Sequence, residues 1–185
     1  MAIPVSVWAD LDAEAKRDRL LDAARELFIR EGLDAPMEAI ARAAGAGVGS
    51  VYRLFATKED LVAALVVRRM AEAQAELDAV LEEPDAWTAL TGALRQMLEV
   101  DACDDVTARA IAVSSERSEV RLARQRFYGT LETLLARARA QGAVRADAGV
   151  LDVRLLFAAA PAAEALEPGS WRRVFELMTD ALRAA

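Results

Sequence analysis

The residues best suited to contact another molecule lie within residues 39–58, where every charged side chain is basic. Arg42, Arg53 and Lys58 are the charged residues of this stretch, and Tyr52 adds a hydroxyl group. Guanidinium, ammonium and hydroxyl groups are donors that bind phosphate oxygens and the edges of bases. The stretch therefore predicts recognition of a nucleic acid. Because a gap of this length without acids also arises by chance, the elements around it must support that interpretation.

Other chemistries are poorly represented. The chain has no histidine, which removes a His-based triad, a His-ligated metal and a His proton shuttle. Its one cysteine, Cys103, permits no internal disulfide, and we interpret it as an inert small residue rather than a redox sensor. The glycines of residues 45–49 precede no Gly-Lys-Ser/Thr of a phosphate-binding loop. We expect no catalytic residue, no metal and no cofactor, and hence no enzyme.

Composition predicts an all-α protein. Among 185 residues, 55% are hydrophobic, alanine is abundant, and only 9 glycines and 5 prolines interrupt the chain. Such residues are strong helix formers, whereas strands favour branched and aromatic residues. The apolar stretch of residues 155–163 is too short to span a bilayer, and the N-terminus lacks the pattern of a signal peptide. We therefore expect a cytoplasmic protein without membrane association.

The net charge of −7 argues against indiscriminate binding to nucleic acid. Residues 1–58, however, carry eight basic and nine acidic side chains, so most of the negative charge lies in residues 59–185. The basic stretch thus belongs to a nearly neutral N-terminal part, and any nucleic-acid contact is expected to be local and specific.

Apolar periodicity predicts about nine helices. Gly32 is a natural stop for the first, Thr57 and Asp60 form a variant capping box at the start of the fourth, and Pro161 is expected to kink or end the eighth. The expected ranges are approximately 12–31, 36–44, 48–55, 58–81, 87–98, 106–113, 118–141, 150–160 and 171–182.

The second and third of these helices form a helix-turn-helix candidate, since both are short and a glycine-containing turn joins them. Burial of an apolar contact between them would project the second helix outward. The buried contact is expected to consist of Ile40, Ala41, Val51 and Phe55, and the exposed residues of Val48, Gly49, Ser50, Tyr52 and Arg53.

Each of the polar candidates also has an ordinary structural interpretation. Tyr52 could be a core aromatic residue, and Lys58 a solvated surface lysine beside the cap formed by Thr57. Arg42 is equally consistent with a phosphate clamp and with a plain surface charge. Ser50 and Arg53 are expected to be exposed under either interpretation.

The N-terminal stretch resembles the DNA-binding domain of the TetR family of repressors over residues 16–66. The resemblance rests on Ile-Ala-Arg-Ala-Ala-Gly at 40–45, Gly-Ser-Val-Tyr-Arg-Leu-Phe at 49–55 and Lys-Glu-Asp-Leu at 58–61. It implies a homodimer that binds a double-stranded, palindromic DNA operator and is released by a small-molecule inducer. It also implies that the Tyr52 hydroxyl contacts phosphate. Lys58 is expected to hold a phosphate together with the amide-rich start of the fourth helix.

The sequence departs from the family pattern at four positions. Ala35 and Pro36 stand where many members have a Thr or Ser that caps the second helix, and Gly47 replaces a capping Ser. Leu54 replaces a common His. The contacts that those side chains make in the family are therefore expected to be missing or replaced.

The C-terminal helices supply candidate surfaces for dimerisation and for a ligand. The last two helices carry apolar faces, and the resemblance places the dimer interface there; its candidate residues are Leu155, Ala159, Trp171, Phe175, Met178 and Leu182. Candidate ligand-pocket residues are Leu90, Leu94, Met97, Phe127 and Leu131, for which plain core packing is the alternative.

We thus predict two domains. Residues 1–58 would form the helix-turn-helix DNA-binding domain, with residues 1–9 disordered, and residues 59–185 the ligand-binding and dimerisation domain. The alternative function is an all-helical small-molecule carrier or scaffold without DNA binding, which would explain the C-terminal part but leave residues 39–58 unexplained.

Overall fold

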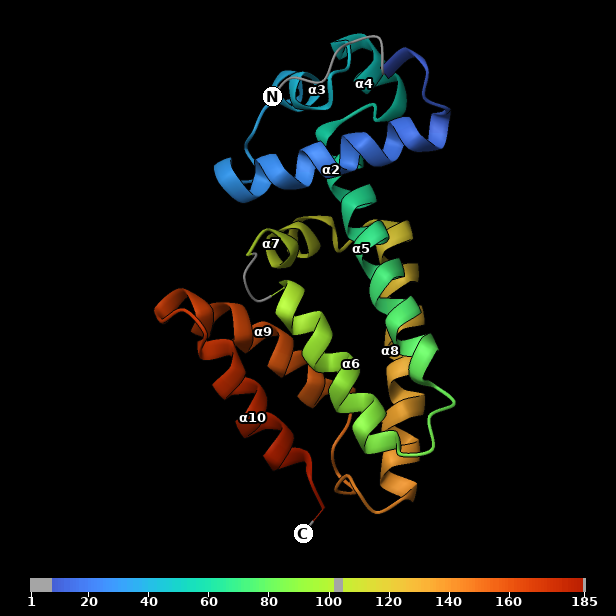
Figure 1. Cartoon of the computed structure of the whole chain (residues 1–185), viewed down its shortest axis with the longest axis vertical. Helices are drawn as coiled ribbons and strands as arrows, with labels where there is room; N and C mark the ends of the chain where they lie inside the picture. The colour runs from blue at the N-terminus through green and yellow to red at the C-terminus, as the bar shows by residue number, and fades with distance from the viewer. Residues whose placement is uncertain (1–7, 102–104, 185) are drawn as a thin grey trace. The chain divides into compact units, whose positions relative to one another are not determined.

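The computed structural model describes residues 8–101 and 105–184, except for the side chains at positions 100, 101, 105 and 108. Within these residues the chain is helical, with one isolated β-bridge between Val144 and Arg183, which confirms the all-α class (Figure 1). The helices are α2 (Ala13–Glu31), α3 (Met37–Ala44), α4 (Val48–Leu54), α5 (Lys58–Val80), α6 (Ala86–Asp101), α7 (Asp105–Ser114), α8 (Ser118–Ala140), α9 (Val150–Leu166) and α10 (Ser170–Leu182). Cys103 lies outside the described residues.

The chain forms two compact units. The N-terminal unit comprises Met1–Arg68 and Val106–Val120, and the C-terminal unit comprises Arg69–Asp105 and Arg121–Ala185. The helices α5 and α8 each contribute residues to both units. A domain boundary after residue 58 stays a prediction, and α7 belongs with the N-terminal helices.

Local side chains define where the helices begin. The Asp12 carboxylate accepts a hydrogen bond from the Ala15 backbone N–H (2.8 Å) and caps α2. At α5, the Asp60 N–H donates to the Thr57 hydroxyl (3.1 Å) while the Thr57 N–H donates to the Asp60 carboxylate (3.0 Å). This reciprocal pair is the predicted capping box.

The structure contradicts one of the two alternatives for Pro161, an end of the helix, and leaves the predicted kink untested; it bears on the predicted disorder of residues 1–9 only at residues 8 and 9. Pro161 lies inside α9, which continues to Leu166. A proline removes one backbone donor but leaves the later N–H groups able to bond, so the helix resumes beyond it. Disorder was predicted for residues 1–9, yet the Trp8 side chain is buried, because a large aromatic side chain gains more from burial than its short segment loses in freedom. Residues 1–7 lie outside the described part.

The larger of two core clusters in the C-terminal unit consists mainly of side chains from α5, α6, α8, α9 and α10. All five predicted ligand-pocket residues belong to this cluster and are buried within it: Leu90, Leu94, Met97, Phe127 and Leu131. In the described chain they form packed core, which was the alternative interpretation.

The predicted dimer-interface residues divide by exposure. Trp171 and Leu182 are buried in the core of their own chain, because the apolar stripe of α10 faces α9 and α6. Trp171 and Leu182 therefore belong to the core of their own chain rather than to the predicted dimer interface. Phe175 and Met178 are half-buried, whereas Leu155 and Ala159 on α9 are exposed. None of the helices in the described residues is long and apolar enough to cross a membrane.

Substitution of Leu94 tests whether the predicted pocket residues form packed core. Because its side chain is fully buried, Leu94→Ala is expected to lower the free energy of unfolding by roughly 2–5 kcal/mol in urea denaturation. Val113→Ala, at a position that is 71% exposed on α7, serves as the control and should change it by less than about 0.5 kcal/mol. An unchanged midpoint for Leu94→Ala would contradict the packed-core assignment.

Candidate nucleic-acid interface

The turn between α3 and α4 depends on Gly45. This residue adopts the left-handed conformation (φ 70°), in which its N–H donates to the Arg42 carbonyl (3.1 Å) and the next N–H, of Ala46, donates to the Ala41 carbonyl (2.8 Å). Glycine adopts this conformation without the steric cost of a side chain. The helix α4 then begins after Gly47, which makes no side-chain cap, in agreement with the predicted loss of a capping serine.

The apolar contact that holds α3 and α4 together is the predicted one. Ile40 and Val51 are fully buried, and Ala41 and Phe55 are 1% and 2% exposed. Since α4 has only seven residues, its position depends on these contacts rather than on its own helical stability. The opposite face of α4 is exposed to solvent.

The outward face of α4 presents the predicted recognition residues. Tyr52 is 44% exposed and Val48 38%, which removes the interpretation of Tyr52 as a core aromatic. Arg53 is also exposed, and its guanidinium donates to the hydroxyl of Ser50 one turn earlier (2.9 Å). Gly49, exposed between them, leaves room for close approach of a groove. That these residues contact DNA stays a prediction.

The two remaining candidates flank α4. Arg42 is exposed in the last turn of α3, and Lys58 is the half-buried first residue of α5. The N–H groups at the start of a helix attract anions, so the Lys58 ammonium adds charge to a place already suited to phosphate. The exposure of Arg42 leaves both of its interpretations open.

An ion pair that sequence reasoning missed supports the start of α5. Arg117, in the segment between α7 and α8, donates to the Asp60 carboxylate from 57 residues away and donates also to Glu119 (2.8 Å). Hydrogen bonding to Thr57, followed by that to Arg117, lowers the pKa of Asp60 below its ordinary value. Asp60 thereby connects the cap of α5 to α7 and α8 within the N-terminal unit.

A basic side chain of α2, Arg17, packs against the end of the recognition helix α4. The Arg17 guanidinium of α2 lies 4.7 Å from the centre of the Phe55 ring, a cation–π contact. Together with Arg53 and Arg117, Arg17 lines a hollow of about 440 Å³ beside the end of α4. Arginines from α2, from α4 itself and from the segment before α8 thus line one hollow beside the end of α4.

Family models match both parts of the chain. One, described as bacterial regulatory proteins of the tetR family, matches residues 20–65, which include α3, α4 and the start of α5. The other, described as the C-terminal domain of SbtR-like transcriptional regulators, matches residues 85–184, more than half of the chain. The chain belongs to the TetR family. It is a transcriptional regulator with a DNA-binding helix-turn-helix, and proteins of this family are regulators rather than enzymes.

Curated relatives of this TetR-family chain resemble it over part of their length. The HTH-type transcriptional regulator SrpR of Pseudomonas putida is 33% identical over 84 residues, 45% of this chain and 39% of that protein. The uncharacterized HTH-type regulator TtgW of the same species is 35% identical over 85 residues, 44% of this chain and 63% of that protein. The matches thus span less than two thirds of either relative.

Solved structures of the family match nearly the whole chain. A TetR transcription regulatory protein from Mycobacterium vanbaalenii is 33% identical and superimposes with a TM-score of 0.66, covering 93% of this chain and 98% of that one. FadR from Bacillus subtilis, solved in complex with stearoyl-CoA, is 18% identical with a TM-score of 0.68, covers 90% and 99%, and shares the fold.

Because the pKa of Asp60 is lowered, we predict that its contribution to folding stability depends on pH. Because its carboxylate is stabilised in the folded state, it contributes stability above the ordinary carboxyl pKa and loses it as the pH falls through the lowered value. Asp60→Asn should therefore reduce the urea midpoint at neutral pH, and the difference from the wild type should shrink on acidification. Glu59→Gln, in the same turn, is the matched control and should lose less. A difference that is constant with pH would contradict this role of the carboxylate.

Proposed function

We propose that the chain is a homodimeric repressor that binds a palindromic DNA operator and is released from it by a small-molecule ligand, acting in the bacterial cytoplasm. The observation that carries the proposal is the α3–α4 pair. Its apolar contact is buried, and Tyr52, Arg53 and Val48 point outward on a short helix whose small residues suit a DNA groove.

A single recognition helix contacts only a few base pairs, so affinity requires two copies. In helix-turn-helix dimers the two recognition helices occupy half-sites about 34–36 Å apart, one turn of DNA, and the operator has a matching dyad. The arrangement suits two chains related by a twofold axis, each contributing one α4.

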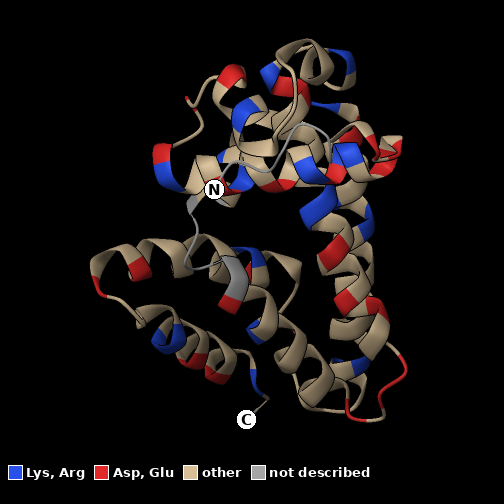
Figure 2. Cartoon of the chain, turned by 45° about the horizontal axis from the view of Figure 1, so that its top comes forward, with Lys and Arg blue, Asp and Glu red and all other residues tan. Residues whose placement is uncertain are grey.

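The helix α9 offers a surface for such pairing. Its charged residues are Asp152, Arg154 and Glu164, and the rest of the helix is uncharged (Figure 2). Its exposed apolar residues include Leu151, Leu155 and Leu166, at 63%, 53% and 89% exposure. Their spacing, with exposed Ala159 between them, places them on one face of the helix. An apolar stripe of this length is costly in water, and a second copy of α9 and α10 would cover it as a four-helix bundle.

Release by a ligand follows from the linkage between two binding events. A ligand lowers operator affinity only as far as it prefers the conformation that binds DNA less well. The neighbour FadR, solved in complex with stearoyl-CoA, supports the proposal that this fold can hold a small molecule. The helix α5 carries Lys58 at its start and belongs at its other end to the C-terminal unit, so a change in α5 would affect a predicted phosphate contact.

The alternative of a carrier or scaffold without DNA binding is disfavoured. A carrier function does not require an exposed Tyr-Arg pair on a short helix, and the family match includes this motif. A gel-shift assay with the DNA flanking the gene tests the proposal directly, and the absence of any specific complex would revive the alternative.

Lys58 and Arg53 should affect DNA binding differently. Lys58→Ala, which removes a phosphate contact, should weaken binding to all operator variants alike and reduce the salt slope by about one. Arg53→Ala, which removes a base contact, should cost ~1–3 kcal/mol and relax specificity at one position. Binding titrations on single-base operator variants separate the two outcomes. A uniform loss for Arg53→Ala would show that it contacts phosphate instead.

A charge introduced at Leu155 tests whether the exposed face of α9 forms the dimer interface. Because its side chain is 53% exposed on α9, Leu155→Glu should leave the chain folded while placing a charge in the proposed interface, giving monomers with weaker operator binding. Val113→Glu on α7, at a position 71% exposed, is the matched control and should remain dimeric. Sedimentation measurements report both masses, and a dimeric Leu155→Glu protein would place the interface elsewhere.

A further inference from the structure

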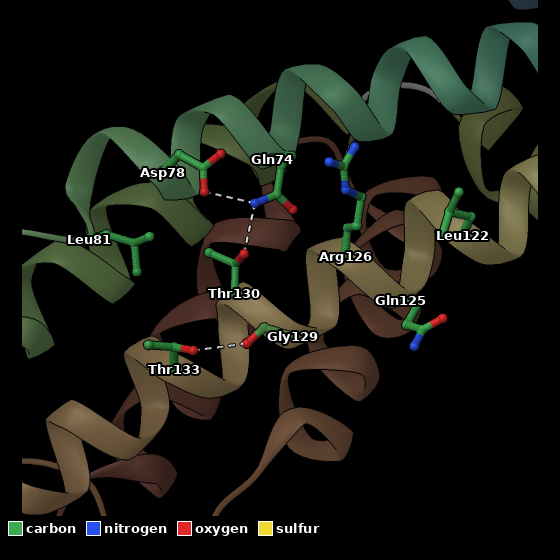
Figure 3. Close-up of a pocket in the computed structure, with 9 residues that line it drawn as sticks. All are labelled: Gln74, Asp78, Leu81, Leu122, Gln125, Arg126, Gly129, Thr130 and Thr133. Carbon is green, nitrogen blue, oxygen red and sulfur yellow. Dashed lines mark hydrogen bonds between the residues drawn. The ribbon is translucent and has the colours of Figure 1, made fainter.

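The groove between α5 and α8 in the C-terminal unit presents a mixture of chemical groups (Figure 3). It has a volume of about 570 Å³, and the apolar Leu81 and Leu122 line it together with the oppositely charged Asp78 and Arg126. Such a mixture indicates no one class of ligand. The outward face of α4 is chemically simpler, and it indicates one kind of contact.

The outward face of α4 includes one purely apolar side chain. Val48 is 38% exposed and ends in two methyl groups, which neither donate nor accept hydrogen bonds. The other exposed residues of the helix are Gly49, Tyr52 and Arg53. The Tyr52 side chain ends in a hydroxyl, and that of Arg53 in a guanidinium that donates to the Ser50 hydroxyl (2.9 Å). Val48 therefore cannot hold a phosphate, and any contact that its side chain makes with DNA is apolar.

The surface beside Val48 is open to a close approach. Val48 lies one turn before Tyr52, so the two side chains share one row of the helix surface, and Gly49 and Arg53 form the neighbouring row. A Cβ atom added at Gly49 would meet nothing within 4 Å, and the same holds at Gly47 on the other side of Val48. Backbone without side chains lets another molecule come close. A side chain as short as valine can then reach the edge of a base.

The major groove of DNA offers valine one favourable contact. Every base pair presents hydrogen-bond donors and acceptors there, and thymine adds an apolar group, its C5-methyl. Against a polar edge, the isopropyl group would displace water without replacing its hydrogen bonds, which costs free energy. Against the thymine methyl, two apolar surfaces leave water together, which is favourable. The contact therefore selects thymine over the other three bases.

We propose that Val48 reads the C5-methyl group of a thymine in each half-site of the operator. The assignment rests on the function proposed above, in which Tyr52 contacts phosphate and Arg53 contacts a base. Val48 then adds a preference for an A·T pair. Because Val48 and Arg53 lie five residues apart, roughly 7.5 Å along the helix, the thymine and the base that Arg53 contacts are expected within a few base pairs of each other.

Deoxyuridine is the probe, because it pairs like thymine but lacks the C5-methyl group. Selection from a random duplex library with the full chain first identifies the operator. Deoxyuridine then replaces each thymine in turn, symmetrically in both half-sites. Loss of one methyl contact should weaken binding about fourfold, so the symmetric replacement should weaken it about fifteenfold at the thymine that Val48 contacts.

Variants at position 48 identify the partner of that methyl group. Val48→Ala shortens the side chain, so the penalty for deoxyuridine at this thymine should fall below about fourfold. Because Val48 is exposed and alanine is the better helix former, this variant should unfold at a urea concentration no lower than that of the wild type. Val48→Ile keeps a branched apolar side chain and should retain the penalty.

Tyr52→Phe is the matched control, since Tyr52 lies one turn from Val48 in the same row. Loss of its hydroxyl should weaken binding to all operator variants alike. The penalty for deoxyuridine should stay at about fifteenfold in this variant. The control thus separates loss of the methyl contact from a general loss of affinity.

A penalty that Val48→Ala removes, and that Val48→Ile and Tyr52→Phe retain, supports the assignment. No thymine at which deoxyuridine weakens binding, or a penalty that Val48→Ala leaves unchanged, overturns it. The selection is a separate readout. Failure to enrich any sequence would overturn the proposed function, whereas an enriched operator whose deoxyuridine response does not depend on residue 48 would overturn the assignment of Val48 alone.

Discussion

The recognition surface depends on the burial of Val51 and Phe55. A seven-residue helix has no stability of its own in water, because nucleation costs more than so few hydrogen bonds return. The helix α4 exists because its inner face packs against Ile40 and Ala41, and its outward residues acquire a fixed direction as a result. Specific readout of DNA requires that fixed direction. The identity of the buried residues thus determines the geometry of the exposed ones.

The next constraint is at the start of α5. Asp60 completes the cap with Thr57 and also accepts the hydrogen bond of Arg117, so one carboxylate holds the helix end and a distant segment together. Lys58 lies two residues before it, at the same helix terminus. A change in the segment around Arg117 therefore has a short physical route to a predicted phosphate contact. The grouping of α7 with the N-terminal helices is consistent with this connection.

Features set by local chemistry were predictable from the sequence. The helices followed from apolar periodicity, the cap of α5 from Thr57 and Asp60, and the turn at Gly45 from the need for a left-handed residue. Long-range features were not predictable. The pair Asp60–Arg117 joins residues that no spacing rule relates, and the burial of Trp171 depends on how α10 packs against α9. Likewise, an apolar stripe indicates that a face is covered but not whether another helix or a ligand covers it.

That ambiguity explains why the predicted pocket residues form packed core. Leu90, Leu94 and Met97 are apolar at helical spacing, and such residues fill a core whenever partner helices are available. Burial distinguishes a core from a pocket wall only once the packing of α5, α6 and α8 is known, because all three helices contribute to the same cluster.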